Sequence, residues 1–437
     1  MEKKSSLGDV VVIGLALFAM FFGAGNLIFP PYLGMNAGNG WFVGFMGFFI
    51  ADVGLALVAI LSMIKSGDVS IEGLTGRLGK VPSTIVNVLV VLCIGPFLAI
   101  PRTAATTFEI GIQPLFPNFN SWVFGAIYFG IVLVLTIRPS SVVDIVGKYM
   151  TPILVLSLLA MIVIGIINPI GEVGVTEGYN TIKEGIVSGY QTMDVLAAVI
   201  FIIILLSTAR EKGYTETKDT MSIVLKSSIF AAGALFVIYG GLTYLGATTS
   251  AGGFEGYNQT GLVVVITETL LGRYGLYMLS VIVLFACLTT AIGLISSCAA
   301  YFEKLTGGKV SYAALVTIIV LFSYIVSNFG ISMIISIAAP VLNVLYPVML
   351  VMIILNFFND KIKNMNIYRV AAVFALAVSL SEVLLGFGLP LGFVKMLPLS
   401  TYGLGWILPA VAGGLIGAFI RSADCNCESD EETVDAV

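Results

Sequence analysis

The chain has 437 residues, of which 58% are hydrophobic and only 11% are charged, and its mean hydropathy is +1.04. Soluble globular proteins carry about 25% charged residues, so this composition excludes a water-soluble body. The net charge of −4 comes with no basic face that would suit nucleic acid, and the lack of histidine removes the commonest metal ligand and proton relay.

In chain order, long continuous apolar runs predict an all-α polytopic membrane protein with twelve transmembrane helices, because barrel strands would show alternation instead. Residues 169–187 and 248–272 are expected to be outward loops. We expect one transmembrane domain over 1–423 and an acidic cytoplasmic tail over 424–437. The approximate spans are 8–33, 39–64, 82–108, 121–137, 140–167, 188–209, 218–247, 273–303, 311–328, 331–357, 369–390 and 399–420.

The distribution of lysine and arginine predicts the orientation. If the N-terminus is cytoplasmic, most of the 21 basic residues fall at inside ends. The exceptions, at outside ends, are Arg102, Lys183, Arg273 and Lys395. This predicts a multi-pass membrane protein with both termini in the cytoplasm.

The first span contains helix-breaking residues at mid-membrane. Glycine lowers helix propensity and proline removes a backbone donor. Backbone groups freed there survive only if they face a cavity, an ion or a substrate. Close packing on a neighbouring helix would explain the glycines but not an asparagine. The residues are Gly23, Ala24, Gly25, Asn26, Pro30 and Pro31.

The sixth span has a polar patch in its outer half, and an acid at membrane depth usually marks an ion or substrate path. The alternative is an interfacial start with the helix beginning at Val195, but the apolar run from there to Leu206 is too short to span alone. The patch comprises Gly189, Tyr190, Gln191, Thr192 and Asp194.

The two predicted breaks are separated by about one five-helix unit and lie in spans of opposite direction. This spacing predicts a 5+5 inverted repeat with broken helices 1 and 6. The first repeat would cover 8–167, the second 188–357, and two extra helices would occupy 369–420.

With these residues in view, the chain resembles the branched-chain amino acid:cation symporter family over essentially its full length. The family has the leucine-transporter fold and belongs to the amino acid-polyamine-cation superfamily. The resemblance implies symport of leucine, isoleucine and valine with a cation, most simply Na⁺. The segments that carry it are FFGAGNLIFPPYLGMNAG, GPFLAIPRTAATTFE, RPSSVVDIVGKYMTPIL and GYQTMDVLAA.

The resemblance also implies a sodium site between helix 1 carbonyls and an Ala-x-x-Thr-Thr motif on helix 8. The motif matches Ala286, Thr289 and Thr290, and the carbonyls would be those of Ala19 and Phe22. Carbonyl and hydroxyl oxygens suit a hard cation. Threonine hydroxyls in helices also bond back to the preceding turn, so a structural role is the alternative.

A possible second cation site pairs Asn26 with Asp194, where relatives carry a neutral hydroxyl. The Asp194 carboxylate would bind a cation, take up a proton or pair with the substrate ammonium, and the sequence does not separate these roles. Lys148 in the fifth span offers a further alternative. In some proton-coupled relatives a helix 5 lysine occupies the sodium position, which would make H⁺ the coupling ion.

For the substrate, the N-terminal end of the outer half of helix 1 offers N–H groups and a positive dipole end to the carboxylate. The ammonium would meet freed carbonyls near the two breaks. One methylene in an apolar pocket is worth about 1–3 kcal/mol, so leucine, isoleucine and valine should be accepted together. The candidate substrate residues are Gly23, Ala24, Gly25, Asn26, Tyr190, Thr192, Met193, Asp194 and Phe97.

Other membrane-embedded charges have separate expected roles. We expect Asp52 to be a structural hydrogen-bond hub, and Arg102 with Glu109 to form an outer gate or an interfacial anchor. Glu382 is a further candidate. A channel would need a continuous polar stripe, and an enzyme would need a nucleophile–base pair or a phosphate loop. We therefore expect a transporter with no cofactor, whose partners are the amino acid and the bilayer, with no nucleic acid and no obligate protein partner.

Overall fold

The computed structural model describes residues 6–137, 142–176, 178–254 and 256–420, and for 142–150 and 217 it describes the backbone alone. These residues form helices and contain no β-strand. The α-helices are α1 Leu7–Phe21, α2 Ala24–Ala37, α3 Trp41–Phe49, α4 Leu55–Ser66, α5 Ile71–Thr75, α6 Lys80–Leu92, α7 Ala99–Thr106, α8 Ser121–Ile137, α9 Val142–Ile167, α10 Thr181–Thr192, α11 Asp194–Glu211, α12 Thr217–Ala247, α13 Gln259–Leu305, α14 Tyr312–Ser327, α15 Ile331–Phe357, α16 Met365–Gly386 and α17 Ile407–Phe419. The 3₁₀ turns are η1 Gly38–Gly40, η3 Gly76–Leu78, η6 Gly392–Met396 and η7 Ser400–Tyr402, and the π-helical turns are η2 Ile50–Gly54, η4 Cys93–Phe97 and η5 Thr107–Ile112.

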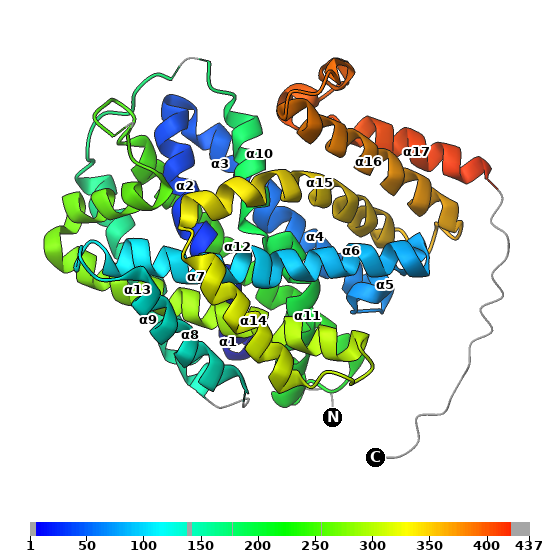
Figure 1. Cartoon of the computed structure of the whole chain (residues 1–437), viewed down its shortest axis with the longest axis horizontal. Helices are drawn as coiled ribbons and strands as arrows, with labels where there is room; N and C mark the ends of the chain where they lie inside the picture. The colour runs from blue at the N-terminus through cyan, green and yellow to red at the C-terminus, as the bar shows by residue number, and fades with distance from the viewer. Residues whose placement is uncertain (1–5, 138–141, 177, 255, 421–437) are drawn as a thin grey trace.

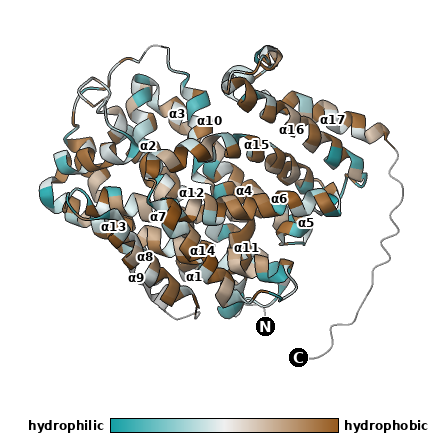
Figure 2. Ribbon diagram, in the orientation of Figure 1, coloured by the Kyte–Doolittle hydropathy of each residue, from teal (hydrophilic) through white to brown (hydrophobic). Residues whose placement is uncertain are grey.

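The helices are those of a membrane protein, which confirms the predicted class. Figure 2 shows hydrophobic residues over most of each helix and hydrophilic residues near helix ends and loops. In the described part of the chain, seven helical stretches are long and apolar enough to cross a membrane, namely Ala24–Ser66, Lys80–Ile112, Thr181–Glu211, Lys218–Ala247, Gln259–Leu305, Ile331–Phe357 and Met365–Gly386. Shorter apolar helices occupy Leu7–Phe21, Ser121–Ile137, Thr151–Ile167, Tyr312–Ser327 and Ile407–Phe419.

The first predicted break is confirmed. Helix α1 ends at Phe21 and α2 begins at Ala24, with Gly23 between them in extended conformation (φ −114°, ψ −163°). Both prolines lie inside α2, where each leaves the carbonyl four residues earlier without its helical donor. The chain therefore presents a helix C-terminus, a helix N-terminus and unpaired carbonyls in the interior.

The second predicted break is also confirmed. Helix α10 ends at Thr192, α11 begins at Asp194, and Met193 between them has φ 70°. A non-glycine residue in the left-handed region is uncommon and persists where the surrounding structure enforces it. The alternative, an interfacial start at Val195, is wrong because α10 is a helix of 12 residues.

Two expected loops are partly helical. Helix α10 starts within 169–187 and α13 starts within 248–272, with a kink in α13 at Gly272 (φ 60°). Each start is capped by an asparagine side chain, Asn180 accepting from the N–H of Lys183 and Asn258 from that of Gly261. Hydropathy alone missed these polar outer turns.

Close backbone contacts hold the broken helices in place. A Cβ added at Gly34 of α2 would lie 1.8 Å from the carbonyl oxygen of Thr243 on α12, and one at Gly246 of α12 would lie 1.9 Å from that of Pro31 on α2. The two helices therefore pack at a distance that only glycine permits. Figure 1 shows α2 and α10 close together in the upper half of the view and α16 with α17 as a pair at one edge.

Candidate functional site

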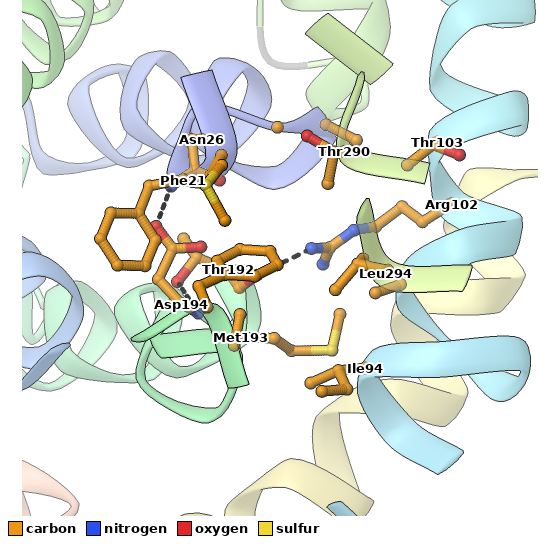
Figure 3. A pocket seen from close by; sticks show the side chains of 16 residues that line it. Phe21, Asn26, Ile94, Arg102, Thr103, Thr192, Met193, Asp194, Thr290 and Leu294 are labelled. Atoms are coloured by element: carbon orange, nitrogen blue, oxygen red, sulfur yellow. Dashed lines mark hydrogen bonds between the residues drawn. The ribbon is translucent and has the colours of Figure 1, made fainter. Parts of the chain in front are cut away.

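The two breaks meet around a cavity of about 30 Å³, walled by α1, α2, α7, α10, α11 and α13 (Figure 3). A water molecule needs roughly 10–15 Å³ on this measure, so the helices close tightly around the site. Gly25 lies behind the wall, where an added Cβ would be 2.9 Å from Nη2 of Arg102. The predicted substrate residues that line the cavity are Gly23, Ala24, Asn26, Thr192, Met193 and Asp194.

The side chain of Asn26 is the centre of a buried polar cluster. Its Nδ2 donates to Oδ2 of Asp194 at 2.8 Å and to the hydroxyl of Tyr239 at 2.6 Å, with Oδ2 of Asp52 at 3.5 Å. All four residues are buried. The cluster thus joins helix 1, helix 6, the second span and α12 at one point. Tyr239, which comes from an otherwise apolar run, was not foreseen.

Asp52 connects the second span to the helix 6 break. Its Oδ1 accepts a hydrogen bond of 2.8 Å from the hydroxyl of Thr192, which also lies 2.6 Å from the carbonyl oxygen of Gly189. Asp52 is fully buried, sits in the wide turn η2 and is absent from the lining of the central cavity, as far as the described residues define it. These contacts confirm the prediction that it is a hydrogen-bond hub.

Arg102 lines the central cavity, so the prediction that it is an interfacial anchor is wrong, while the alternative of an outer gate stays a prediction. Its guanidinium donates from Nη1 to the carbonyl of Gln191 and from Nη2 to that of Thr192 at 3.0 Å, and the residue is 4% exposed. The reason is the turn η4, where Gly95 leaves the helical conformation (φ −98°, ψ −129°) and redirects α7 inward. Because the break at Met193 interrupts the helical hydrogen bonds there, the Arg102 guanidinium supplies donors to the carbonyls of Gln191 and Thr192.

Phe97 does not line the cavity, and its prediction as a pocket wall is wrong. Half of its surface is exposed and its ring packs on Phe322 at 5.1 Å, because the same turn at Gly95 directs it outward. The apolar wall comes instead from side chains that the sequence did not single out, including Met20, Phe21, Ile94, Phe201 and Leu294.

Tyr190 faces away from the central cavity. It lines a separate, larger cavity of about 670 Å³, together with Lys183 and Glu382. Its ring stacks on that of Tyr346 at 4.5 Å, and Tyr346 is fully buried within electrostatic range of Asp52 and other groups of the polar cluster. The stacked rings therefore connect the lining of this larger cavity with the surroundings of the cluster.

The residues predicted to hold sodium lie on facing elements. Ala19, Phe22, Ala286 and Thr289 line one small space of about 10 Å³ between α1, α9 and α13, to which α9 contributes Thr151 and Leu154. The hydroxyl of Thr289 bonds back to its own helix, 3.0 Å from the carbonyl oxygens of Phe285 and Ala286. This is the structural alternative that the sequence left open.

Thr290 faces the central cavity instead. Its hydroxyl has no hydrogen-bond partner among the described residues and lies 3.4 Å from a Cβ position built on Gly23. The side chain of Lys148, the candidate for proton coupling, lies outside the described residues.

Contacts at the two ends of the bundle lie away from this site. Glu109 accepts from the hydroxyl of Thr260 and the N–H of Ile331, both at 2.8 Å, so it ties the C-terminal end of the third span to the starts of α13 and α15. At the other end, the Tyr214 hydroxyl donates to Oδ2 of Asp9 at 2.9 Å and joins α1 to the turn after α11.

Comparison with known sequences assigns the chain. Residues 6–424 match the family model described as branched-chain amino acid transport protein. The chain belongs to this family. Within it, the chain is 35% identical to the branched-chain amino acid permease BrnQ of Bacillus subtilis, over 95% of the chain and 98% of the relative. It is 37% identical to the permease BraB of the same organism, over 95% and 96%. A member of a permease family is a transporter rather than an enzyme, as predicted.

Solved structures show that this family member has the expected leucine-transporter-like fold. It matches a Na⁺-coupled sialic acid symporter in a substrate-bound outward-open state with a TM-score of 0.63 and 13% identity, over 94% of the chain and 90% of the symporter. It matches the nucleobase-cation-symport-1 family transporter Mhp1 in a closed conformation with a TM-score of 0.60 and 15% identity, over 94% and 92%. MhsT in complex with L-phenylalanine gives 0.57 and 16%, over 96% and 99%.

Proposed function

We propose that this protein imports leucine, isoleucine and valine across the bacterial inner membrane together with a cation, most simply Na⁺, by alternating access. The observation that carries the proposal is the meeting of two broken helices at a buried cavity with a carboxylate, Asp194, on one side and a guanidinium, Arg102, on the other. Such a cavity suits a zwitterion. The names of the branched-chain permease relatives support the substrate class.

The proposed architecture has twelve membrane spans with both termini cytoplasmic. Helices occur at each predicted span, and the two breaks interrupt the first and the sixth spans. This arrangement supports inverted repeats over 8–167 and 188–357, with 369–420 added, within one domain of 1–423 that is followed by the tail of 424–437. Rocking of one repeat element against the other would expose the cavity alternately to each side.

In the proposed binding mode, the substrate carboxylate meets the first-turn N–H groups of α2 and the ammonium meets the Asp194 side of the cavity. Gly23 leaves the N-terminus of α2 without a side-chain cap, so these N–H groups are available to a ligand in the described structure. The aliphatic side chain would pack on Phe21, Ile94 and Met193, which explains a preference for branched apolar amino acids over polar ones.

The proposed cation site uses carbonyls at the end of α1 and the threonines of α13. The last carbonyls of a helix lack intrahelical partners, and α1 ends deep in the protein. Ala19, Phe22, Ala286 and Thr289 already surround one small space, and Thr290 follows directly in the chain. A second cation position between Asn26 and Asp194 remains part of the proposal.

Leucine uptake into proteoliposomes tests the proposal. An inward Na⁺ gradient should drive accumulation, and Thr289→Ala should abolish the stimulation by Na⁺. Thr317→Ala is the matched control, because Thr317 makes the same bond to its preceding turn on the exposed face of α14. Accumulation driven by a pH gradient alone would replace Na⁺ by H⁺ as the coupling ion and direct attention to Lys148. No leucine uptake under any gradient would refute the substrate assignment.

A further inference from the structure

The guanidinium of Arg102 has hydrogen-bonding capacity that the fold does not use. Its Nη1 and Nη2 donate to the carbonyls of Gln191 and Thr192, but its Nε has no partner within the described part of the chain. The side chain is 4% exposed and lines the central cavity. Leaving a buried charged donor unpaired is unfavourable, so the position of this N–H indicates an acceptor that arrives with a ligand.

The surroundings of Arg102 favour an anion. The guanidinium lies against the first turn of α2, since a Cβ on Gly25 would come within 2.9 Å of Nη2. The N-terminus of a helix carries a partial positive charge and outward N–H groups. Two positive features thus lie side by side in a dry cavity, an arrangement that a negatively charged group stabilises.

The opposite wall has the opposite charge. Asp194 lies across the cavity, hydrogen-bonded to Asn26, while Arg102 reaches in from α7 (Figure 3). A ligand with a carboxylate at one end and an ammonium at the other matches this polarity. An amine that lacks the carboxylate would leave the Arg102 side of the cavity unmatched.

We propose that Arg102 is the specificity-determining residue for the substrate carboxylate, with its Nε–H completing the receptor that the first turn of α2 begins. This inference rests on the proposed function. Because the same guanidinium holds the carbonyls of Gln191 and Thr192, carboxylate binding also fastens helix 1 to the break of helix 6. The substrate thereby strengthens the contact between the two broken helices.

A purely structural role is the alternative to be excluded. If Arg102 only braced the helix 6 break, its loss would weaken all ligands of the cavity to the same extent. A role in carboxylate recognition predicts a selective loss. L-Leucine and 3-methylbutylamine, which is leucine without its carboxylate, distinguish the two roles.

The experiment measures binding of both compounds to the purified full-length protein by competition with labelled leucine. Arg102→Gln should weaken leucine roughly 10- to 100-fold, the effect of one charge-assisted hydrogen bond, and should change amine affinity far less. Arg102→Lys should give a smaller selective loss, because the ammonium keeps the positive charge but lacks the planar fork that reaches two carbonyls and a carboxylate in fixed directions. Arg273→Gln is the matched control, because Arg273 is exposed, and it should bind both compounds as the unaltered protein does.

The outcomes separate this inference from the proposed function. If the unaltered protein binds no leucine, the proposed function fails and the inference fails with it. If it binds leucine but both Arg102 variants lose leucine and amine equally, or lose neither, the inference is overturned and the proposed function stands. Should Arg102→Gln fail to fold, the selectivity of Arg102→Lys decides.

Discussion

Replacing Gly246 with alanine should separate α2 from α12 and disturb the site through the backbone. The added Cβ would lie 1.9 Å from the carbonyl oxygen of Pro31, and real Cβ contacts essentially never fall below 3.0 Å. Both partners are backbone or fixed to it, so no side-chain rotation relieves the clash, and the helices must part by about 1 Å. Overpacking of this kind lowers the free energy of unfolding by about 1–3 kcal/mol.

The same displacement reaches the polar cluster. Nδ2 of Asn26 on α2 lies 2.6 Å from the hydroxyl oxygen of Tyr239 on α12, and a shift of about 1 Å takes these two atoms beyond hydrogen-bonding distance. In enzymes, a misplacement of about 1 Å at the active site can lower the rate about 100-fold, and we expect leucine affinity to be sensitive in the same way. Gly246→Ala should therefore lower both the melting temperature of the purified protein and its leucine affinity.

A control variant lies on the same helix. Gly233 is exposed, and within the described structure nothing lies within 4 Å of an added Cβ there. Gly233→Ala should leave leucine binding unchanged and raise stability slightly, by roughly 0.5–1 kcal/mol, because alanine is the better helix former. If the two alanine variants melt and bind alike, the close approach of α2 to α12 is refuted.

Two further substitutions test single hydrogen bonds. Tyr239→Phe removes the hydroxyl that accepts a hydrogen bond from Asn26. Leucine affinity, measured by calorimetry, should fall about two- to tenfold without loss of folding. Unchanged affinity would show that this bond does not position Asn26. Tyr214→Phe removes the hydroxyl that donates to Asp9, so hydrogen exchange at the start of α1 should accelerate. Tyr274→Phe is the control, because Tyr274 is exposed and its loss should not change this exchange. Equal exchange in both variants would contradict the assigned contact.

The positions of the two breaks could be predicted from local sequence. Gly23 and its neighbours, followed by two prolines, cannot continue an ordinary helix, and the interruption lies within a few residues of the predicted centre. The polar patch before Asp194 likewise marks the second break, which the structure places at Met193. Helix propensity and the cost of unpaired backbone N–H and C=O groups in lipid depend on local sequence, so the positions of the breaks could be predicted from it.

The inward or outward direction of third-span side chains could not be predicted in the same way. A regular helix period assumes 3.6 residues per turn, and the wide turn η4 changes the register of everything after it. Arg102, expected to form an outer gate or an interfacial anchor, therefore lines the cavity, whereas Phe97, expected to line it, is half exposed. The adjacent Gly95 and Pro96 were the available signal. Tyr239 enters the site only because glycines let α12 approach α2, a long-range contact that one sequence does not reveal.

The stacked rings of Tyr190 and Tyr346 have a consequence for inhibitor design. Tyr190 lines a cavity of about 670 Å³, and Tyr346 lies near the polar cluster beside the central cavity, whose volume is only about 30 Å³. Under the proposed transport function, a blocker therefore need not imitate leucine. A compound shaped to the 670 Å³ cavity, with an acidic group for Lys183 and a basic group for Glu382, would pack against Tyr190 and stabilise the stacked rings. Its potency would then depend on how well it fills the 670 Å³ cavity and not on competition with leucine for the central cavity.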